Sequence, residues 1–129
     1  MAVDVKVYRV LVESSGYTAI DITEYVRSVV TEAGLVRGLA VVYAVERGCS
    51  VAEVEYELEL LADLEVLLKN LGCVETDLCS VVLGREVIVP VVNGSLFLGQ
   101  FKNIVLVDVS RAAGSKSVVI ALEGVFKNS

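Results

Sequence analysis

Valine at alternating positions is the feature of the sequence that most limits the folds open to this chain. Valine supplies 28 of the 129 residues, and its branched side chain favours the pleated backbone of a β-strand over a helix. Between residues 3 and 11 apolar and polar side chains alternate, which is the period of an amphipathic strand. The chain is therefore expected to be rich in strands.

Composition excludes a disordered chain and a membrane span. Apolar residues make up 55% of the sequence and the mean hydropathy is +0.70, so the chain has ample apolar surface to bury. The longest unbroken apolar run, Leu39–Val45, is far shorter than the roughly 18 residues that a membrane-spanning helix needs. The length fits one domain over residues 1–129.

The balance of charge and the absence of histidine remove several classes of function. With 17 acidic and 11 basic residues, the net charge is −6 and the isoelectric point is near 4.6, which makes nucleic acid and anionic membranes poor partners. The sequence contains no histidine, which excludes Ser-His-Asp and Cys-His nucleophilic sites and histidine-bound zinc. Any general acid or base has to be Glu, Asp, Lys, Tyr or Cys.

The cysteines indicate the redox state of the cellular compartment in which the protein works. There are three of them, Cys49, Cys73 and Cys79. An odd number of cysteines, with no secretory signal in the first twelve residues, predicts a reducing cytoplasmic location. Three roles stay open for them: small buried side chains, a disulfide, or a reactive thiol. Their spacing is not the Cys-x-x-Cys spacing of a structural zinc site.

The first third of the chain predicts two strands and a helix. Residues 3–11 and 17–20 are expected to form a hairpin. A helix follows, with Asp21 as N-cap, Glu24 completing a capping box and Gly34 ending it in the left-handed conformation. Helical spacing assigns its apolar face to Ile22, Val26, Val29, Val30 and Ala33.

The middle of the chain contains one clear strand and one ambiguous segment. Residues 38–45 are nearly all apolar, which predicts a strand buried on both faces. Residues 50–71 mix both periodicities. The preferred interpretation is an extended segment to about Glu55 followed by a helix to Leu71, and the rival is a single helix capped by Ser50.

The last part of the chain predicts a short helix over residues 74–83 and then strands. Asn93-Gly94 is the strongest hairpin signal in the sequence, and Pro90 indicates an edge strand or a bulge. The strands are expected over residues 86–92, 95–98, 102–109 and 116–126. Because hairpins dominate the connections, the chain is expected to be an α+β domain with antiparallel strands.

The order of the motifs resembles that of the YjbQ family. The run Pro90–Gly94 matches the family's proline-valine-valine-aspartate-glycine, and Leu98–Lys102 matches its leucine-glycine-threonine-tryptophan-glutamine. Leu83-Gly84, Asp21–Thr23 and Gly38-Leu39 also fit. The resemblance covers essentially the whole chain. It implies an antiparallel β-sandwich of about six to eight strands with two or three helices, assembled as a homotrimer.

The sequence departs from the family at the family's polar cluster. The resemblance implies a histidine after the 38–45 strand and a His-x-His pair before Gly84, and those three positions are Glu46, Glu75 and Asp77 here. Glu55 fills the family's glutamate position. Two interpretations stay open. The site has decayed, or these carboxylates hold a divalent cation such as Mg²⁺, Mn²⁺ or Ca²⁺ in place of zinc.

Some members of the family have been credited with a secondary thiamine-phosphate-synthase activity, so the resemblance also implies a small phosphorylated ligand. The candidate catalytic residues are Glu46, Arg47, Ser50 and Glu55. The candidate substrate-binding residues are Gly99, Gln100, Arg111 and Lys116. Arg111 and Lys116, with Arg47, are the cations that could hold a phosphate.

Three functional hypotheses follow from these residues. The chain is an inactive family member kept for assembly or binding, an enzyme on a small phosphorylated substrate, or a subunit of a hetero-oligomer whose partner supplies the histidines. Composition favours assembly independently of the family. A monomer of this size buries only about two-thirds of its unfolded surface, so a chain that is 55% apolar leaves exposed apolar patches unless a partner covers them.

Overall fold

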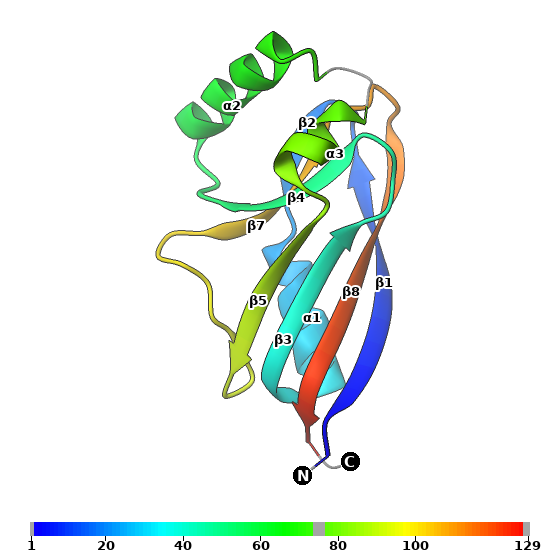
Figure 1. Ribbon diagram of the computed structural model, residues 1–129, viewed down its shortest axis with the longest axis vertical. Helices are drawn as coiled ribbons and strands as arrows, with labels where there is room; N and C mark the ends of the chain where they lie inside the picture. The colour runs from blue at the N-terminus through cyan, green and yellow to red at the C-terminus, as the bar shows by residue number, and fades with distance from the viewer. Residues whose placement is uncertain (1, 74–76, 128–129) are drawn as a thin grey trace.

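The computed structural model describes residues 2–73 and 77–127, which form two antiparallel sheets and three helices (Figure 1). The larger sheet has the strand order β1-β8-β3-β5-β6, and the smaller sheet has the order β2-β7-β4. The elements are β1 (Asp4–Ser14), β2 (Thr18–Asp21), α1 (Thr23–Ala33), β3 (Leu35–Ala44), β4 (Cys49–Val54), α2 (Leu58–Asn70), α3 (Leu78–Leu83), β5 (Glu86–Val92), β6 (Ser95–Leu96), β7 (Asn103–Asp108) and β8 (Gly114–Phe126). The predicted α+β fold is confirmed.

The smaller sheet lies between two apolar layers. On one side, Ile104 and Leu106 of β7 pack in the main core with α1 and the inner face of the larger sheet. On the other side, Val105 and Val107 join a second core beneath α2 and α3. Alternate residues of a strand point to opposite faces, so β7 contributes to both cores.

The strand that is buried on both faces is therefore β7, and the prediction that residues 38–45 are buried on both faces is wrong. In β3, Ala40 and Val42 are fully buried, whereas Leu39 and Tyr43 are exposed on the opposite face. The physical reason is the layer order. The larger sheet is covered on one face by α1 and the smaller sheet, and no described residue covers the other face.

The predicted hairpin between the first two strands is also wrong. β1 pairs with β8 along its whole length, and β2 pairs with β7 in the smaller sheet. The turn that joins them carries the chain from one sheet to the other. Asn93-Gly94 does form the predicted tight turn, with φ of 51° and 77°, and joins β5 to the two-residue strand β6.

Helix α1 begins later than its predicted cap. Ile22 is the N-cap residue and Thr23 is the first helical residue, while the Asp21 carboxylate accepts from the backbone N–H of Thr23 at 3.0 Å. Glu24 pairs with Arg27 instead of completing a capping box. The predicted apolar face is confirmed in Val26, Val29 and Val30, which are buried, and Gly34 ends the helix with φ of 76°.

The ambiguous segment divides into a strand and a helix, as in the preferred interpretation. The strand β4 ends at Val54, and α2 begins after Glu57, whose carboxylate accepts from the backbone N–H groups of Glu59 and Leu60. The rival single helix from Ser50 is wrong, because residues 49–54 pair with β7. α3 ends before Gly84 as predicted, and residues 74–76 lie outside the described part of the chain.

A disulfide between Cys73 and Cys79 joins the end of α2 to α3. Both cysteines are buried in the second core with Leu68. Of the three roles left open for the cysteines, the structure assigns a disulfide to this pair and a buried free thiol to Cys49. None of the helices described has the length and apolar character needed to cross a membrane.

Candidate functional site

A buried carboxylate, Asp108, is the centre of a polar cluster at the end of the smaller sheet. Asp108 is the last residue of β7, and its side chain is fully buried. Its Oδ2 accepts from the hydroxyl of Ser14 at 2.6 Å, and its Oδ1 accepts from the backbone N–H of Ser110 at 2.9 Å. The Nζ of Lys116 lies 3.9 Å from Oδ2. A buried charge is tolerated because it has hydrogen bonds and a counter-charge.

Two candidate residues, Glu46 and Lys116, lie beside this cluster. The Lys116 ammonium donates to the hydroxyl of Ser110 at 3.3 Å. Glu46 Oε2 accepts from the backbone N–H of Ser117 at 3.1 Å, so this carboxylate fastens the loop after β3 to the start of β8. Both side chains stabilise the ends of strands.

The Cys49 thiol lies next to the same cluster and is fully buried. Burial first, and the neighbouring Asp108 carboxylate second, raise the pKa of the Cys49 thiol to about 12. The thiolate is the nucleophilic form of cysteine. Cys49 therefore stays protonated at neutral pH and acts as a small apolar side chain.

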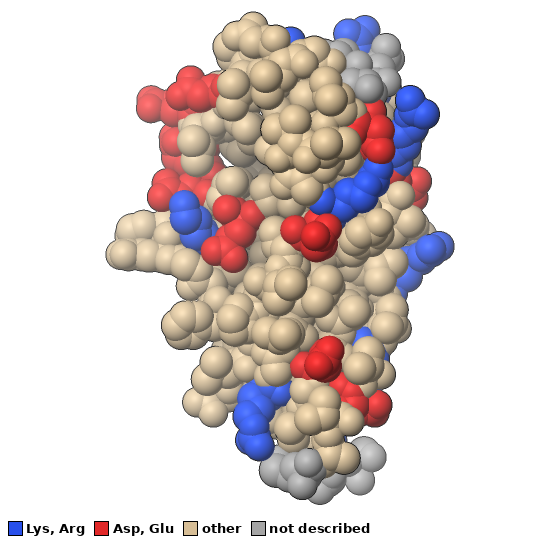
Figure 2. All heavy atoms as spheres, viewed as in Figure 1, with Lys and Arg blue, Asp and Glu red and all other residues tan. Residues whose placement is uncertain are grey.

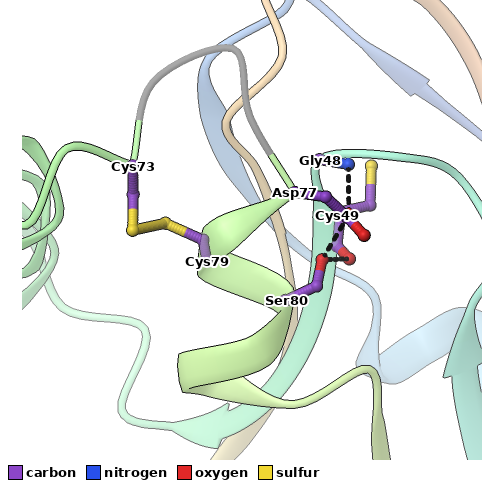
Figure 3. The surroundings of a disulfide bond; sticks show 6 residues. All are labelled: Gly48, Cys49, Cys73, Asp77, Cys79 and Ser80. Carbon is purple, nitrogen blue, oxygen red and sulfur yellow. Dashed lines mark hydrogen bonds between the residues drawn. A yellow bond between two sulfur atoms is a disulfide. The ribbon is translucent and has the colours of Figure 1, made fainter.

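Asp77 connects α3 to the loop between β3 and β4 (Figure 3). Its Oδ1 accepts from the backbone N–H of Gly48 at 3.0 Å and from the hydroxyl of Ser80 at 2.9 Å. Its Oδ2 pairs with Arg85, which also donates to the carbonyl oxygen of Glu46 at 3.4 Å. The Gly48 N–H, and after it the Ser80 hydroxyl, lower the pKa of Asp77 below its usual value.

The hypothesis of a divalent cation names Glu46, Glu75 and Asp77. In the described part of the chain no three His, Cys, Asp or Glu side chains are grouped so that they could hold a metal ion. Glu75 lies outside the described residues. Glu46 and Asp77 have protein donors on their carboxylates, and the cation site stays a prediction.

The four candidate substrate-binding residues are divided between two ends of the smaller sheet. Gly99 and Gln100 are exposed in the loop before β7, where the Gly99 N–H donates to Glu53 at 3.4 Å. Arg111 and Lys116 follow the other end of β7. At about 3.3 Å per residue, the six residues of β7 separate the two pairs by roughly 17 Å, so one small ligand cannot contact both pairs.

The remaining candidate catalytic residues do not converge either. Arg47 is exposed in the loop after β3, and Glu55 is half-buried after β4. Ser50 is buried within β4, where its hydroxyl has no hydrogen-bond partner among the described residues. With its pairing to Val107 of β7, Ser50 is a residue of the sheet interior.

Sequence reasoning missed Asp108 and Arg85, which organise the two polar clusters. A signal for Asp108 was present, because it is the single carboxylate that interrupts the otherwise apolar run Ile104–Val109. A charge at such a position has to be buried with partners or to end the strand. Arg85 had no signal of its own, since its partner Asp77 is close to it only because α3 turns the chain back.

Comparison with known families gives one family over most of the chain. The family described as UPF0047 protein YjbQ-like matches residues 9–125. A comparison with curated proteins finds no match.

Solved structures give the same fold. A YbjQ-like protein of unknown function from Sulfolobus solfataricus P2 is 22% identical, with a TM-score of 0.83 over 95% of this chain and 100% of that one. A hypothetical protein from Aeropyrum pernix K1 is 24% identical, with a TM-score of 0.79 over 95% and 99% of the two chains. A YjbQ/UPF0047 protein from Clostridium acetobutylicum is 18% identical, with a TM-score of 0.81 over 89% and 98%.

Proposed function

The chain belongs to the UPF0047 YjbQ-like family, and from that premise we propose that it works as a homotrimeric assembly and binding protein. Its copies meet through the uncovered face of the larger sheet. Glu46 and Asp77, at two of the positions where the family has histidines, serve as structural contacts. The number of three copies rests on the family resemblance, and the existence of an interface rests on the surface of this chain.

The observation that carries the proposal is an exposed apolar face on the larger sheet, called the outer face below. The large apolar side chains of this face are between 40% and 63% exposed, and they are Val5, Val7, Leu11, Leu39, Tyr43, Ile88 and Val92. Strand register places Val7 opposite Ala121, Ala121 opposite Val41, and Val41 opposite Ile88, so one apolar row crosses four strands. Figure 2 shows a broad area without charged side chains over the middle of β3, β5 and β8, with charged side chains above and below it.

A single exposed apolar side chain needs no explanation, but a contiguous apolar face marks an interaction surface. The strand β1 makes the case most clearly. Val5, Val7 and Leu11 point outward together with Arg9 and Glu13, whereas Lys6 and Tyr8 occupy the inner positions. A surface strand of a monomer would be expected to have the opposite arrangement. The apolar side of β1 is suited to a surface that a second copy covers.

The contacts of Glu46, of the metal-ligand candidate Asp77 and of the Cys49 thiol support assembly over turnover. Glu46 accepts from a β8 backbone N–H, and Asp77 is paired with Arg85. The Cys49 thiol is buried and protonated. The carboxylates of Glu46 and Asp77 are engaged by protein donors and the Cys49 thiol is buried, whereas an acid, base or nucleophile has to reach a substrate.

The test is the sedimentation of two matched charge variants. Val7→Glu places a carboxylate in the middle of the outer face, while Val66→Glu makes the same change on α2, where the side chain is similarly exposed (63% and 59%). We expect Val7→Glu to sediment as a monomer and Val66→Glu to sediment as wild type. If Val7→Glu assembles as wild type does, the outer face is not the interface.

An activity assay separates the two other hypotheses. Wild-type protein is incubated with the substrates of thiamine-phosphate synthesis, with and without Mg²⁺, Mn²⁺ or Ca²⁺, and no turnover is expected. Cation-dependent turnover would favour the enzyme hypothesis. Co-purification of a histidine-containing homologue in a fixed ratio would favour the hetero-oligomer.

A further inference from the structure

The loop between β6 and β7 displays two aromatic side chains that neither the fold nor the outer face explains. Phe97 is 67% exposed and Phe101 is 76% exposed, while no other described aromatic side chain is more than 45% exposed. Figure 1 shows that this loop projects from the side of the molecule. We infer that the loop inserts its aromatic side chains into a neighbouring copy, in the cleft between α2 and the smaller sheet. The inference rests on the proposed assembly and adds a second contact to it.

Phe101 occupies a backbone position that favours glycine. The N–H of Lys102 donates to the carbonyl oxygen of Gly99 at 3.0 Å, which closes a four-residue turn with Gln100 and Phe101 at its centre. Phe101 has a φ of 60°, in the left-handed region that bulky side chains rarely adopt. A phenylalanine with this backbone and an exposed ring does not stabilise the fold of its own chain. Strained residues of this kind concentrate at functional sites.

The cleft has the size and the lining that an aromatic side chain requires. Its volume is about 370 Å³, within the range of about 300–1,000 Å³ typical of sites that hold small molecules. Leu61, Leu64 and Leu68 of α2 form one wall, and Ala19 and Val107 of the smaller sheet form the other. Leu64 and Leu68 also pack in the second core, so this wall is held in place. An aromatic ring that enters an apolar pocket is the commonest kind of anchor in a protein interface.

The charges near the two surfaces are complementary. Helix α2 contains three acidic residues and one basic residue, a net charge of −2, and its lysine, Lys69, is already paired with Glu65 at 2.8 Å. The loop 97–102 contains Lys102 and no acidic residue. An acidic helix beside the cleft therefore favours the approach of a loop that carries a lysine next to its aromatic side chain.

The symmetry of a ring explains why the loop and the cleft have to belong to different copies. In a ring of three copies each copy presents two different surfaces, one to each neighbour. Neither Phe97 nor Phe101 lines the cleft of its own chain. The loop and the cleft are such a pair of surfaces, whereas a contact between two identical surfaces is complete with two copies.

The first experiment measures the assembly of matched variants by sedimentation. Phe101→Ser removes the exposed ring, and its control Val81→Ser removes a similarly exposed apolar side chain (80%) from α3. Ala62→Phe fills the cleft from an exposed position on α2, and its control Val66→Phe enlarges a side chain of the same helix outside the cleft. We expect the dissociation constant of the assembly to rise at least about tenfold in Phe101→Ser and Ala62→Phe, and to change less than about twofold in the two controls.

A mixture of the two impaired variants shows whether the contact runs from loop to cleft. Phe101→Ser keeps an intact cleft and Ala62→Phe keeps an intact loop, so one copy of each can form a single loop-to-cleft contact without closing a ring. We expect the mixture to form a particle of twice the chain mass of 13.8 kDa, while each variant alone stays at the chain mass.

A glycine variant separates the strain of the turn from the contact. Glycine adopts a positive φ without steric cost, so Phe101→Gly should melt at a higher temperature than Phe101→Ser in dilute protein. It should assemble as poorly as Phe101→Ser, because both lack the ring. Thermal unfolding also shows that the variants are folded, as expected for changes at the exposed positions of Phe101 and Ala62.

The outcomes distinguish this inference from the proposed function. If Phe101→Ser and Ala62→Phe assemble as wild type while Val7→Glu dissociates, the loop-to-cleft contact is wrong and the outer face stands. A mixture that stays at the chain mass would also overturn the contact. If Val7→Glu assembles as wild type while Phe101→Ser and Ala62→Phe dissociate, the contact holds and the outer face is wrong. A monomeric wild type would contradict both.

Discussion

The two faces of the larger sheet carry similar side chains in different surroundings. The inner face buries Val42, Val89 and Ile120 against α1 and the smaller sheet. The outer face leaves Val7 and Ile88 exposed. Apolar alternation therefore identifies a strand without identifying the side on which the core lies. In this chain one side of the sheet is covered by the chain itself, and on our proposal the other side is covered by its copies.

The largest expected effect is a loss of stability that distinguishes the inner face of the larger sheet from its outer face. Ile120→Ala removes a fully buried side chain and should lower the free energy of unfolding by about 2–5 kcal/mol at every protein concentration. Ile88→Ala should cost within about 0.5 kcal/mol in dilute protein and more at high concentration, where on our proposal copies stabilise one another. Denaturant unfolding at several concentrations checks both variants. A loss in Ile88→Ala that does not vary with concentration would remove the distinction.

The second largest effect is expected in the polar cluster at the end of the smaller sheet. Asp108→Ala deletes a buried carboxylate that accepts from Ser14 and from the Ser110 backbone and faces Lys116. Hydrogen bonds to charged groups contribute about 1.5–3 kcal/mol, so we expect a loss of that size. Asp108→Asn keeps one acceptor oxygen and should lose less. Urea unfolding of the two variants compares them, and equal losses would show that the hydrogen bonds are not what Asp108 supplies.

The disulfide between Cys73 and Cys79 should contribute about as much to the second core. The two cysteines are separated by 6 positions, and closing a loop of this length stabilises the folded state by about 2 kcal/mol in the chain-entropy account. The double variant Cys73→Ser with Cys79→Ser should unfold at lower urea than oxidised wild type. Reduced wild type should lie near the variant. Identical transitions with and without reductant would contradict a stabilising disulfide.

The smallest expected effect is a pH dependence of stability that comes from Asp77, which joins the start of α3 to the loop between β3 and β4. Its folded pKa is lowered, so its contribution to stability is present above the ordinary carboxylate pKa near 4 and is lost as the pH falls through the folded value. Melting temperatures below about pH 4 should fall less steeply in Asp77→Asn than in wild type. Superimposed profiles would show that the contacts with Gly48, Ser80 and Arg85 do not favour the charged form.

Local sequence patterns predicted where helices and strands form. Tertiary contacts determine which strands pair and which faces are buried. The α1 face, the Asn93-Gly94 turn and the division of residues 50–71 depend on nearest neighbours, and these predictions are confirmed. The pairing of β1 with β8 joins residues a hundred or more positions apart. No local pattern contains that information.

The candidate site was less predictable than the fold, because site residues were carried over by position in the sequence. Gly99 is predicted from a family motif and Lys116 as a cation that could hold a phosphate, yet they lie beyond opposite ends of β7. Tyr17, which lines both a cleft between α2 and the smaller sheet and the depression next to it, belongs to no motif. Its place depends on the crossing from one sheet to the other.

The mass of the wild-type protein in solution tests the central claim most directly. Light scattering after size exclusion, over a dilution series in the micromolar range, measures that mass without any substitution. A homotrimer predicts a particle three times the chain mass of 13.8 kDa that dissociates, if at all, only at the lowest concentrations. A mass of 13.8 kDa throughout the series would contradict the account, because the outer face would then be exposed in the working protein.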